Sequence, residues 1–205
     1  ENTRYQSTEK KIGVGNVAQL DVKWAFTTQG DVSATPAVDG SKVYVPNWMG
    51  NLYAVDRSTG KQVWAKKISD ATGLPGDKAR ATPVISGNKV IVGTQGPFGG
   101  GGKMLAFDKD TGALLWNTAI ESHPAAIITQ SAVVHGNRVY VGTSSIEEAF
   151  AAVIPDYPCC SFRGSMLALD VNTGAILWKT EMVPAGYSGG AILLSDKAEP
   201  RRMIP

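Results

Sequence analysis

The chain has 205 residues, of which 43% are hydrophobic and 19% are charged, so it is long enough for a sizeable core and is not disordered. Twenty Lys and Arg residues against eighteen Asp and Glu residues leave a formal net charge of +2, which predicts no nucleic-acid or membrane-surface partner. No apolar run reaches the roughly eighteen residues of a transmembrane helix, so no membrane span is expected.

Short runs rich in Val, Ile, Thr and Tyr between turn residues predict an all-β protein. The first expected element is a strand at residues 20–26, which contains Trp24. Pairs of strands joined by tight turns follow, at residues 34–38 and 42–45, 81–85 and 89–92, and 131–134 and 138–141. Their turns are Asp39-Gly40, Gly87-Asn88 and Gly136-Asn137.

One pattern, Ala-x-Asp-x-x-Thr-Gly-x-x-x-Trp, follows each pair of strands, at residues 54–64, 106–116 and 168–178. The Asp side chain can accept hydrogen bonds from the next backbone amides, which begins a tight turn, and Gly supplies the positive φ that closes it. The Trp lies on the following strand, where its ring can cover the gap between neighbouring units. Repeats of roughly 40–50 residues are typical of propellers or solenoids.

The strands on either side of this turn bring each unit to four antiparallel strands, which predicts the blades of a β-propeller. The expected blades span about residues 33–66, 80–118 and 129–180. Because propellers need about four to eight blades to close, the chain is expected to be part of a larger protein, with the missing blades as partners. Residues 1–190 are assigned to the propeller, and residues 191–205 to an irregular tail.

Long connections are confined to particular places in the pattern. Residues 69–78, 96–103 and 146–163 each join a second strand to a third or one blade to the next. Since antiparallel strands alternate in direction, these insertions are predicted to lie on one face, opposite the Thr-Gly turns. Loops gathered on one face of a rigid scaffold are where a functional site is normally built.

The two cysteines are adjacent, at Cys159 and Cys160. A disulfide between them would close an eight-membered ring, and such a bond persists in an oxidising compartment. We expect this vicinal disulfide and, with it, a periplasmic or secreted protein. Two reduced thiols in a loop are the alternative.

The repeated unit resembles the tryptophan-docking motif of the quinoprotein alcohol dehydrogenases, which are eight-bladed propellers. Residues 2–5 and the run at residues 159–165 are most similar to the polyvinyl alcohol dehydrogenase branch. The resemblance implies a parent protein that oxidises an alcohol by hydride transfer to pyrroloquinoline quinone, with Ca²⁺ as Lewis acid. It also implies an electron acceptor such as a cytochrome c.

The resemblance places quinone contacts at the starts of the first strands of the blades. Arg80 and Thr129 match the family's arginine and threonine there, whereas Ser33 stands where the family usually has glutamate. The same comparison matches Gly-Thr-Ser-Ser-Ile-Glu, at residues 142–147, to the family's Gly-Ser-Ser-Gly-Ala-Glu.

That second match implies that Ser144 and Ser145 contact the quinone and that Glu147 binds the metal, as a carboxylate suits a hard cation. A solvated glutamate in a loop is the plainer alternative for Glu147. No catalytic base is assigned, because the family's aspartate base belongs to a later blade.

The vicinal cysteines depart from the methanol dehydrogenases, in which the pair precedes the first strand of an earlier blade. Here Cys159 and Cys160 lie in the 146–163 insertion, on the same expected face, from which they could cover the quinone. Arg163 is a candidate second contact to an anionic ligand, with pairing to Asp156 as the alternative.

Other residues receive plainer interpretations. His123 and His135 have no ligand spacing and are expected to be surface or turn residues. Trp48 is expected to be a rim aromatic rather than a substrate platform. Residues 99–102 are glycines without a following Lys-Ser/Thr, so they indicate a flexible insertion rather than a phosphate loop.

The repeat alone does not specify catalysis. It is shared with the outer-membrane assembly lipoprotein, a cofactor-free scaffold of the same fold, so a protein-binding or assembly scaffold is the alternative function. An inactive truncated product is a third possibility. The vicinal cysteines and the matched Ser-Ser-Ile-Glu favour the enzyme, because a scaffold needs neither.

Overall fold

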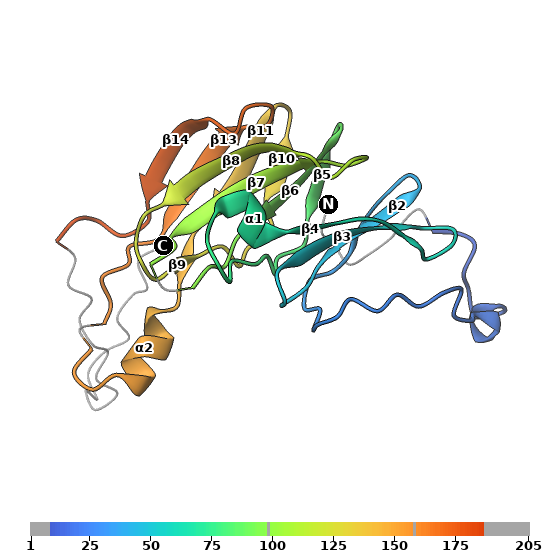
Figure 1. Ribbon diagram of the computed structural model, residues 1–205, viewed down its shortest axis with the longest axis horizontal. Coiled ribbons are helices and arrows are strands. Elements are labelled where there is room, and N and C mark those ends of the chain that lie inside the picture. The colour runs from blue at the N-terminus through green and yellow to red at the C-terminus, as the bar shows by residue number, and fades with distance from the viewer. Residues whose placement is uncertain (1–8, 98, 158, 187–205) are drawn as a thin grey trace.

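The computed structural model describes residues 9–97, 99–157 and 159–186, and these residues form four antiparallel sheets (Figure 1). The first sheet contains β1 (Ala37–Asp39), β2 (Lys42–Pro46), β3 (Asn51–Asp56) and β4 (Gln62–Lys67). The second contains β5 (Val84–Ser86), β6 (Lys89–Gly93), β7 (Gly102–Asp108) and β8 (Leu114–Glu121). The third contains β10 (Val133–His135), β11 (Arg138–Gly142), β13 (Ser165–Asp170) and β14 (Ile176–Glu181). The fourth pairs only β9 (Ala126–Ile127) with β12 (Ser144–Ser145).

The three four-stranded sheets confirm the predicted all-β fold with antiparallel blades. Their strands are hydrogen-bonded in chain order, and the first strands of neighbouring blades lie against one another, β1 beside β5 and β5 beside β10. Residues 2–5 and the expected tail at residues 191–205 lie outside the described residues. Within the described ranges, no helix combines the length and apolar character needed to cross a bilayer.

The first strand of each blade begins later than predicted, at Ala37, Val84 and Val133 rather than at residues 34, 81 and 131. In the first two blades a proline, Pro36 or Pro83, stands directly before the strand. Proline has no N–H to donate to a sheet ladder, which explains why the ladder begins after it.

The prediction of a strand at residues 20–26 was wrong, because this segment has no regular secondary structure. Within the described residues no neighbouring strand offers it a ladder. Two helices in the insertions were not predicted either, α1 (Ile68–Thr72) and α2 (Glu147–Val153). Upstream, a single 3₁₀ turn, η1, covers Val17–Gln19. The run of Glu, Ala and Phe in α2 combines good helix formers with acidic residues in the first turn, which favours a helix.

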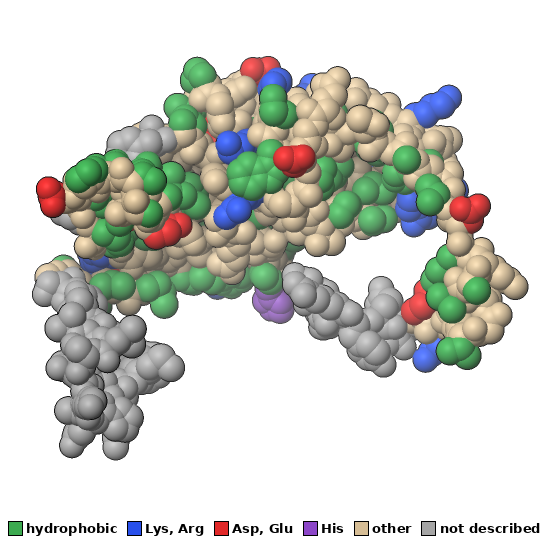
Figure 2. All heavy atoms as spheres, turned by 90° about the horizontal axis from the view of Figure 1, so that it is seen from below, with side chains coloured by type: hydrophobic (Ala, Val, Ile, Leu, Met, Phe, Trp, Pro, Cys, Tyr) green, Lys and Arg blue, Asp and Glu red, His purple; other side chains and the backbone are tan. Residues whose placement is uncertain are grey.

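The first two insertions contact each other, and the connection at residues 122–128 contacts both the second and the third, as expected for insertions on one face. Leu74, after α1, packs against Gly96 and Gly100 of the second insertion. The Gly99 N–H donates to the Pro124 carbonyl at 2.8 Å, so the stretch expected to be a flexible insertion is fastened to the next blade. Figure 2 views the molecule from below, where basic and acidic side chains are scattered among apolar ones.

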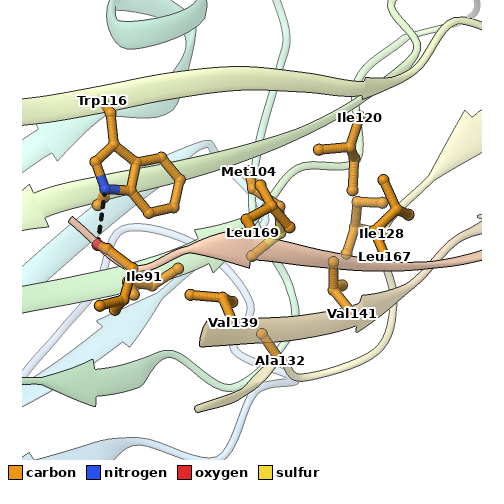
Figure 3. Close-up of a cluster of buried hydrophobic side chains, with 12 residues drawn as sticks. Ile91, Met104, Trp116, Ile120, Ile128, Ala132, Val139, Val141, Leu167 and Leu169 are labelled. Carbon is orange, nitrogen blue, oxygen red and sulfur yellow. Dashed lines mark hydrogen bonds between the residues drawn. The ribbon is translucent and has the colours of Figure 1, made fainter. Parts of the chain in front are cut away.

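The apolar core lies between facing sheets. Figure 3 shows the cluster between the second and third blades, where Met104 and Trp116 meet Val139, Leu167 and Leu169. An equivalent cluster fills the space between the first and second blades, and its large members are Tyr44, Leu52, Trp64, Val90, Leu105 and Phe107. Full burial of one such side chain contributes roughly 1.5–3 kcal/mol, so these interfaces hold successive blades together.

A tryptophan of the first blade and one of the second dock on the turn of the following blade. The indole N–H groups of Trp64 and Trp116 donate to the carbonyls of Lys109 and Val171, each at 3.1 Å. Figure 3 marks the second of these bonds. Trp24 donates to the Arg57 carbonyl at 2.8 Å, so it performs the docking role of a preceding blade although it lies in no strand.

The turn that receives the indole is built by its aspartate and glycine. In the third blade, Asp170 Oδ1 accepts from the backbone N–H groups of Asn172 and Thr173, each at 2.9 Å. Gly174 has a φ of 73°, and a Cβ placed on it would lie 2.7 Å from Cδ2 of Trp116. The glycine is therefore required both for the left-handed backbone and for the close approach of the ring.

Gly174→Ala should destabilise the protein more than Gly136→Ala does. The difference between the two variants separates the effect of the docking contact from that of backbone strain. Both glycines have positive φ, but nothing lies within 4 Å of a Cβ placed on Gly136. Strain alone costs about 1 kcal/mol, and the clash with Trp116 should add roughly 1–3 kcal/mol. Urea unfolding followed by tryptophan fluorescence measures the difference, and equal midpoints for the two variants would contradict the docking role.

Acid should weaken the turns, because their aspartates are stabilised as anions. Hydrogen bonds from the Ser58 and Thr59 side chains lower the pKa of Asp56 from 3.8 to about 2. A lowered folded-state pKa gives stability that is present above pH 3.8 and is lost as the pH falls toward 2. The unfolding midpoint of the wild type should therefore approach that of Asp56→Asn in this window. An Asp31→Asn control, at an exposed residue, should show no such convergence.

Candidate functional site

Three equivalent positions lie before the first strands of the blades. In the first two blades, the segment that precedes this strand pairs with the residue after the second strand: Trp48 N–H donates to the Asp31 carbonyl at 2.9 Å, and Gln95 N–H to the Lys78 carbonyl at 2.7 Å. In the third blade Ile127 of β9 pairs with Ser144 of β12. Ser33, Arg80 and Thr129 each stand two residues after the pairing residue, so they occupy the same place in successive blades. These three positions and the residues next to them are called the rim.

Arg80 lies over the ring of Trp48, and Lys78 lies over the same ring. The distances to the ring centroid are 5.4 Å from Cζ of Arg80 and 5.3 Å from Nζ of Lys78. The Trp48 indole N–H donates to Ser33 Oγ at 3.0 Å. Trp48 is thus a half-buried rim aromatic, as expected, but it also organises two cations, which the sequence did not indicate.

Neither cation is neutralised by a neighbour in the described part of the chain, where the salt bridges involve other lysines and His123. Two like charges beside one ring repel each other unless an anion lies near them. The arrangement at Lys78 and Arg80 therefore favours an anionic ligand, held by charge-assisted hydrogen bonds.

Thr129 and Ser144 are brought together, with 3.4 Å between Oγ1 and Oγ. Ser145 is the second residue of β12 and pairs with Ala126. Its Oγ lies 3.5 Å from the backbone N of Glu147, the first residue of α2. The matched run at residues 142–147 therefore leads from the rim position of the third blade into the α2 insertion.

Glu147 is buried, with a relative exposure of 1%, rather than solvated in a loop. Its Oε1 accepts from the Tyr157 hydroxyl at 3.2 Å and from the N–H and Oγ–H of Ser161 at 3.0 and 2.9 Å. Its Oε2 accepts from the Phe162 N–H at 2.7 Å. Burial raises the pKa of Glu147, but the bonds from Ser161, Phe162 and Tyr157 outweigh burial and leave this pKa below its ordinary value.

The predicted disulfide between Cys159 and Cys160 is present, and both residues are exposed. The donors to Glu147 flank this pair in the sequence. Arg163 does not pair with Asp156 in the described structure, because its Nε–H donates to the Val183 carbonyl at 2.7 Å. No hydrogen bond or ion pair of the described residues joins Arg80 to Thr129, or either of them to the disulfide. The ligand contacts predicted from the sequence all stay predictions: those of Arg80, Thr129, Ser144, Ser145, Cys159, Cys160 and Arg163.

The two histidines differ in exposure and in their contacts. His135 is an exposed residue of β10, as expected. His123 is half-buried, and its Nε2 lies 2.9 Å from Ser161 Oγ. Spacing in the sequence could not reveal this contact, because His123 lies in the connection after β8 and Ser161 lies in the third insertion.

Asp77 was also missed by sequence reasoning. It is 2% exposed, and its Oδ1 accepts from the Lys78 N–H at 2.9 Å. Its Oδ2 has no hydrogen-bond partner among the described residues, and the same is true of the nearby Oγ1 of Thr94. Burial raises the pKa of Asp77, with Thr72 and Lys103 acting in the opposite direction. A buried acid thus stands directly before the Lys78–Arg80 segment.

The family model described as "Outer membrane protein assembly factor BamB" (PQQ_2) matches residues 14–198, so the chain belongs to this family. Among curated proteins, the chain is 34% identical over 231 residues to the polyvinylalcohol dehydrogenase of Sphingopyxis sp. (strain 113P3). That alignment covers 100% of this chain and 33% of the relative. The chain therefore spans about a third of the length of this relative and of a second polyvinylalcohol dehydrogenase, from Pseudomonas sp..

Solved structures show the same fold. The quinohemoprotein alcohol dehydrogenase from Comamonas testosteroni superposes with a TM-score of 0.59 at 24% identity, over 75% of this chain and 28% of that one. BamB from Moraxella catarrhalis superposes with a TM-score of 0.53 at 22% identity, over 77% of this chain and 39% of that one. Both likenesses support a partial β-propeller.

Asp77→Asn should stabilise the protein at neutral pH. The amide removes a buried charge and can donate to the Oγ1 of Thr94, while its oxygen still accepts from Lys78. A gain of about 0.5–1.5 kcal/mol is expected from one net hydrogen bond. Because the folded-state pKa of Asp77 is raised, the part of the gain due to charge should vanish as the pH falls below 3.8. Urea unfolding at pH 7 and pH 3 tests this, and a destabilised Asp77→Asn at pH 7 would contradict it.

Proposed function

We propose that the protein of which this chain is part oxidises an alcohol and uses pyrroloquinoline quinone as the hydride acceptor. The observation that carries the proposal is the pair of cations, Lys78 and Arg80, on Trp48 at one of three equivalent rim positions. Arg80 is also where the family resemblance implies a quinone contact. The similarity to a polyvinylalcohol dehydrogenase supports an enzyme parent and points to a secondary or polymeric alcohol as substrate.

The residues of this rim fit a planar quinone that bears three carboxylates. Arg80 and Lys78 supply positive charge, and the hydroxyls of Thr129 and Ser144 supply further hydrogen-bonding groups on the next blade. A charge-assisted hydrogen bond to a carboxylate contributes roughly 1.5–3 kcal/mol. When bound, the quinone would accept the hydride from the alcohol carbon, and these side chains would hold and orient it. No described residue is assigned as the catalytic base.

Calcium fits the described residues less well. Ca²⁺ takes about six to eight oxygen ligands, but the oxygens of Glu147 already accept four hydrogen bonds. The described residues contain no group of three His, Cys, Asp or Glu side chains that could hold a metal ion. No step is derived through calcium, and the assignment of Glu147 as its ligand stays a prediction.

Compartment and electron acceptor follow from the same proposal. The exposed vicinal disulfide is consistent with export to an oxidising compartment, the periplasm or the outside of the cell. The reduced cofactor would pass its electrons to an acceptor such as a cytochrome c.

A cofactor-free scaffold for protein binding or assembly is the second candidate. The family model is described as an outer membrane protein assembly factor, and BamB from Moraxella catarrhalis has the same fold. A scaffold gives no reason for two unneutralised cations at the rim, so we favour the enzyme. An inactive product is the third candidate, because the chain spans only about a third of its curated relatives.

Quinone titration of the apoprotein with all its blades separates these functions. We expect saturable quenching of tryptophan fluorescence, together with dye-linked oxidation of a secondary or polymeric alcohol that requires the quinone. Arg80→Gln and Lys78→Gln should each raise the Kd of the quinone roughly 10-fold or more, because each removes one charge-assisted contact. Lys23→Gln, at an exposed residue far from the rim segment in sequence, is the control. Wild-type protein that binds no quinone would leave the scaffold as the better proposal.

A further inference from the structure

We propose that Glu147 is the anchor of the described residues on both sides of the disulfide, residue 157 and residues 159–162, and that it positions Cys159 and Cys160 through Ser161 and His123 without a metal ion. This inference concerns a different role for Glu147 from the one that the family resemblance implies. It does not depend on the proposed function, because every contact that carries it lies within the described chain.

The donors to Glu147 bracket the disulfide on both sides. Tyr157 precedes the cysteines, and Ser161 and Phe162 follow them. A single carboxylate thus accepts hydrogen bonds from residues on both sides of the disulfide. Burial of a carboxylate is costly unless hydrogen bonds compensate for the loss of water, and here four donors do so. The same donors place partial positive charge at both oxygens, which competes with a cation for that position.

His123 ties this loop to the preceding blade connection. The Ala125 N–H donates to Nδ1 of His123 at 3.2 Å, so Nδ1 acts as an acceptor and the hydrogen of the neutral ring lies on Nε2. Nε2 then donates to Ser161 Oγ at 2.9 Å, and the Ser161 hydroxyl hydrogen is directed to Glu147 Oε1 at 2.9 Å. The rings of His123 and Phe162 also meet edge to face, with centroids 5.4 Å apart.

The direction of these bonds excludes a nucleophilic serine. In a Ser–His pair that activates a nucleophile, the serine hydroxyl donates to an unprotonated ring nitrogen. Here the Ser161 hydroxyl donates to Glu147, and the neighbouring nitrogen of His123 carries its own hydrogen. The network therefore positions the segment and prepares no attack.

Hydrogen exchange of the full chain in chelator-containing buffer tests the proposal. Glu147→Gln should speed exchange of the Ser161 and Phe162 amides at least 10-fold, because the amide group turns at least one acceptor into a donor. Glu148→Gln is the matched control, since Glu148 is the next residue of α2 and is exposed. It should leave both amides unchanged.

Ser161 provides a second, milder test in case Glu147→Gln does not fold. Ser161→Ala should speed exchange at Phe162 by a few-fold, and Ser161→Thr, which keeps the hydroxyl, should restore the wild-type rate. A loss of packing alone would not be rescued by the hydroxyl. The proposal is overturned if both amides exchange at wild-type rates in Glu147→Gln without metal, or if they become protected only when Ca²⁺ is added. Failure of the quinone titration would leave these rates unaffected, so the two ideas fail separately.

Discussion

The rest of the structure depends on the hydrogen bond from an indole N–H of one blade to a backbone carbonyl in the turn of the next. The bond recurs at Trp24, Trp64 and Trp116 with distances of 2.8, 3.1 and 3.1 Å. It requires a carbonyl held in one place, and the turn aspartate provides that by accepting the backbone amides that follow it. It also requires an open surface for the ring, which only glycine leaves. Trp178, the next member of the series, is 40% exposed and has no such bond within the described residues.

The docking of each tryptophan, at the last strand of a blade, also fixes how the first strands of neighbouring blades are placed relative to each other. Because each blade meets the next in the same way, the segments before the first strands repeat in register, and Ser33, Arg80 and Thr129 become equivalent. The fold thus presents one variable residue per blade at a shared rim. Substitution at these positions can change what the rim presents while the docking contacts stay the same.

The repeat allowed the blades, their strand order and the common face of the insertions to be predicted, because all three follow from local periodicity and strand parity. The start of each first strand was misplaced, partly because Pro36 and Pro83 remove donors that the ladder needs. The strand around Trp24 was wrong for a different reason, since a strand requires a partner that a local pattern does not reveal. The helix α2 was missed because its seven residues stand alone inside an insertion.

The residues of the candidate site were likewise predicted from the sequence only in part. Arg80, Thr129 and Ser144 could be named because they stand at fixed offsets from the repeat. The surroundings of Glu147 could not, since Tyr157 and Ser161 reach it from the third insertion and His123 from the connection after β8, and no periodicity determines their paths. The buried Asp77 escaped notice because an acid in a Leu-Pro-Gly-Asp run is usually solvated, and only the packing of the first two insertions covers it.

The insertion at residues 146–163 determines the surroundings of Glu147. The same carboxylate cannot give all its lone pairs both to a loop and to a cation. In this chain the insertion at residues 146–163 supplies four donors of its own, so the anion is compensated from within the blade. An unattached loop of this length would lose much conformational freedom on ordering, and the hydrogen bonds that its residues donate to Glu147 offset part of that cost.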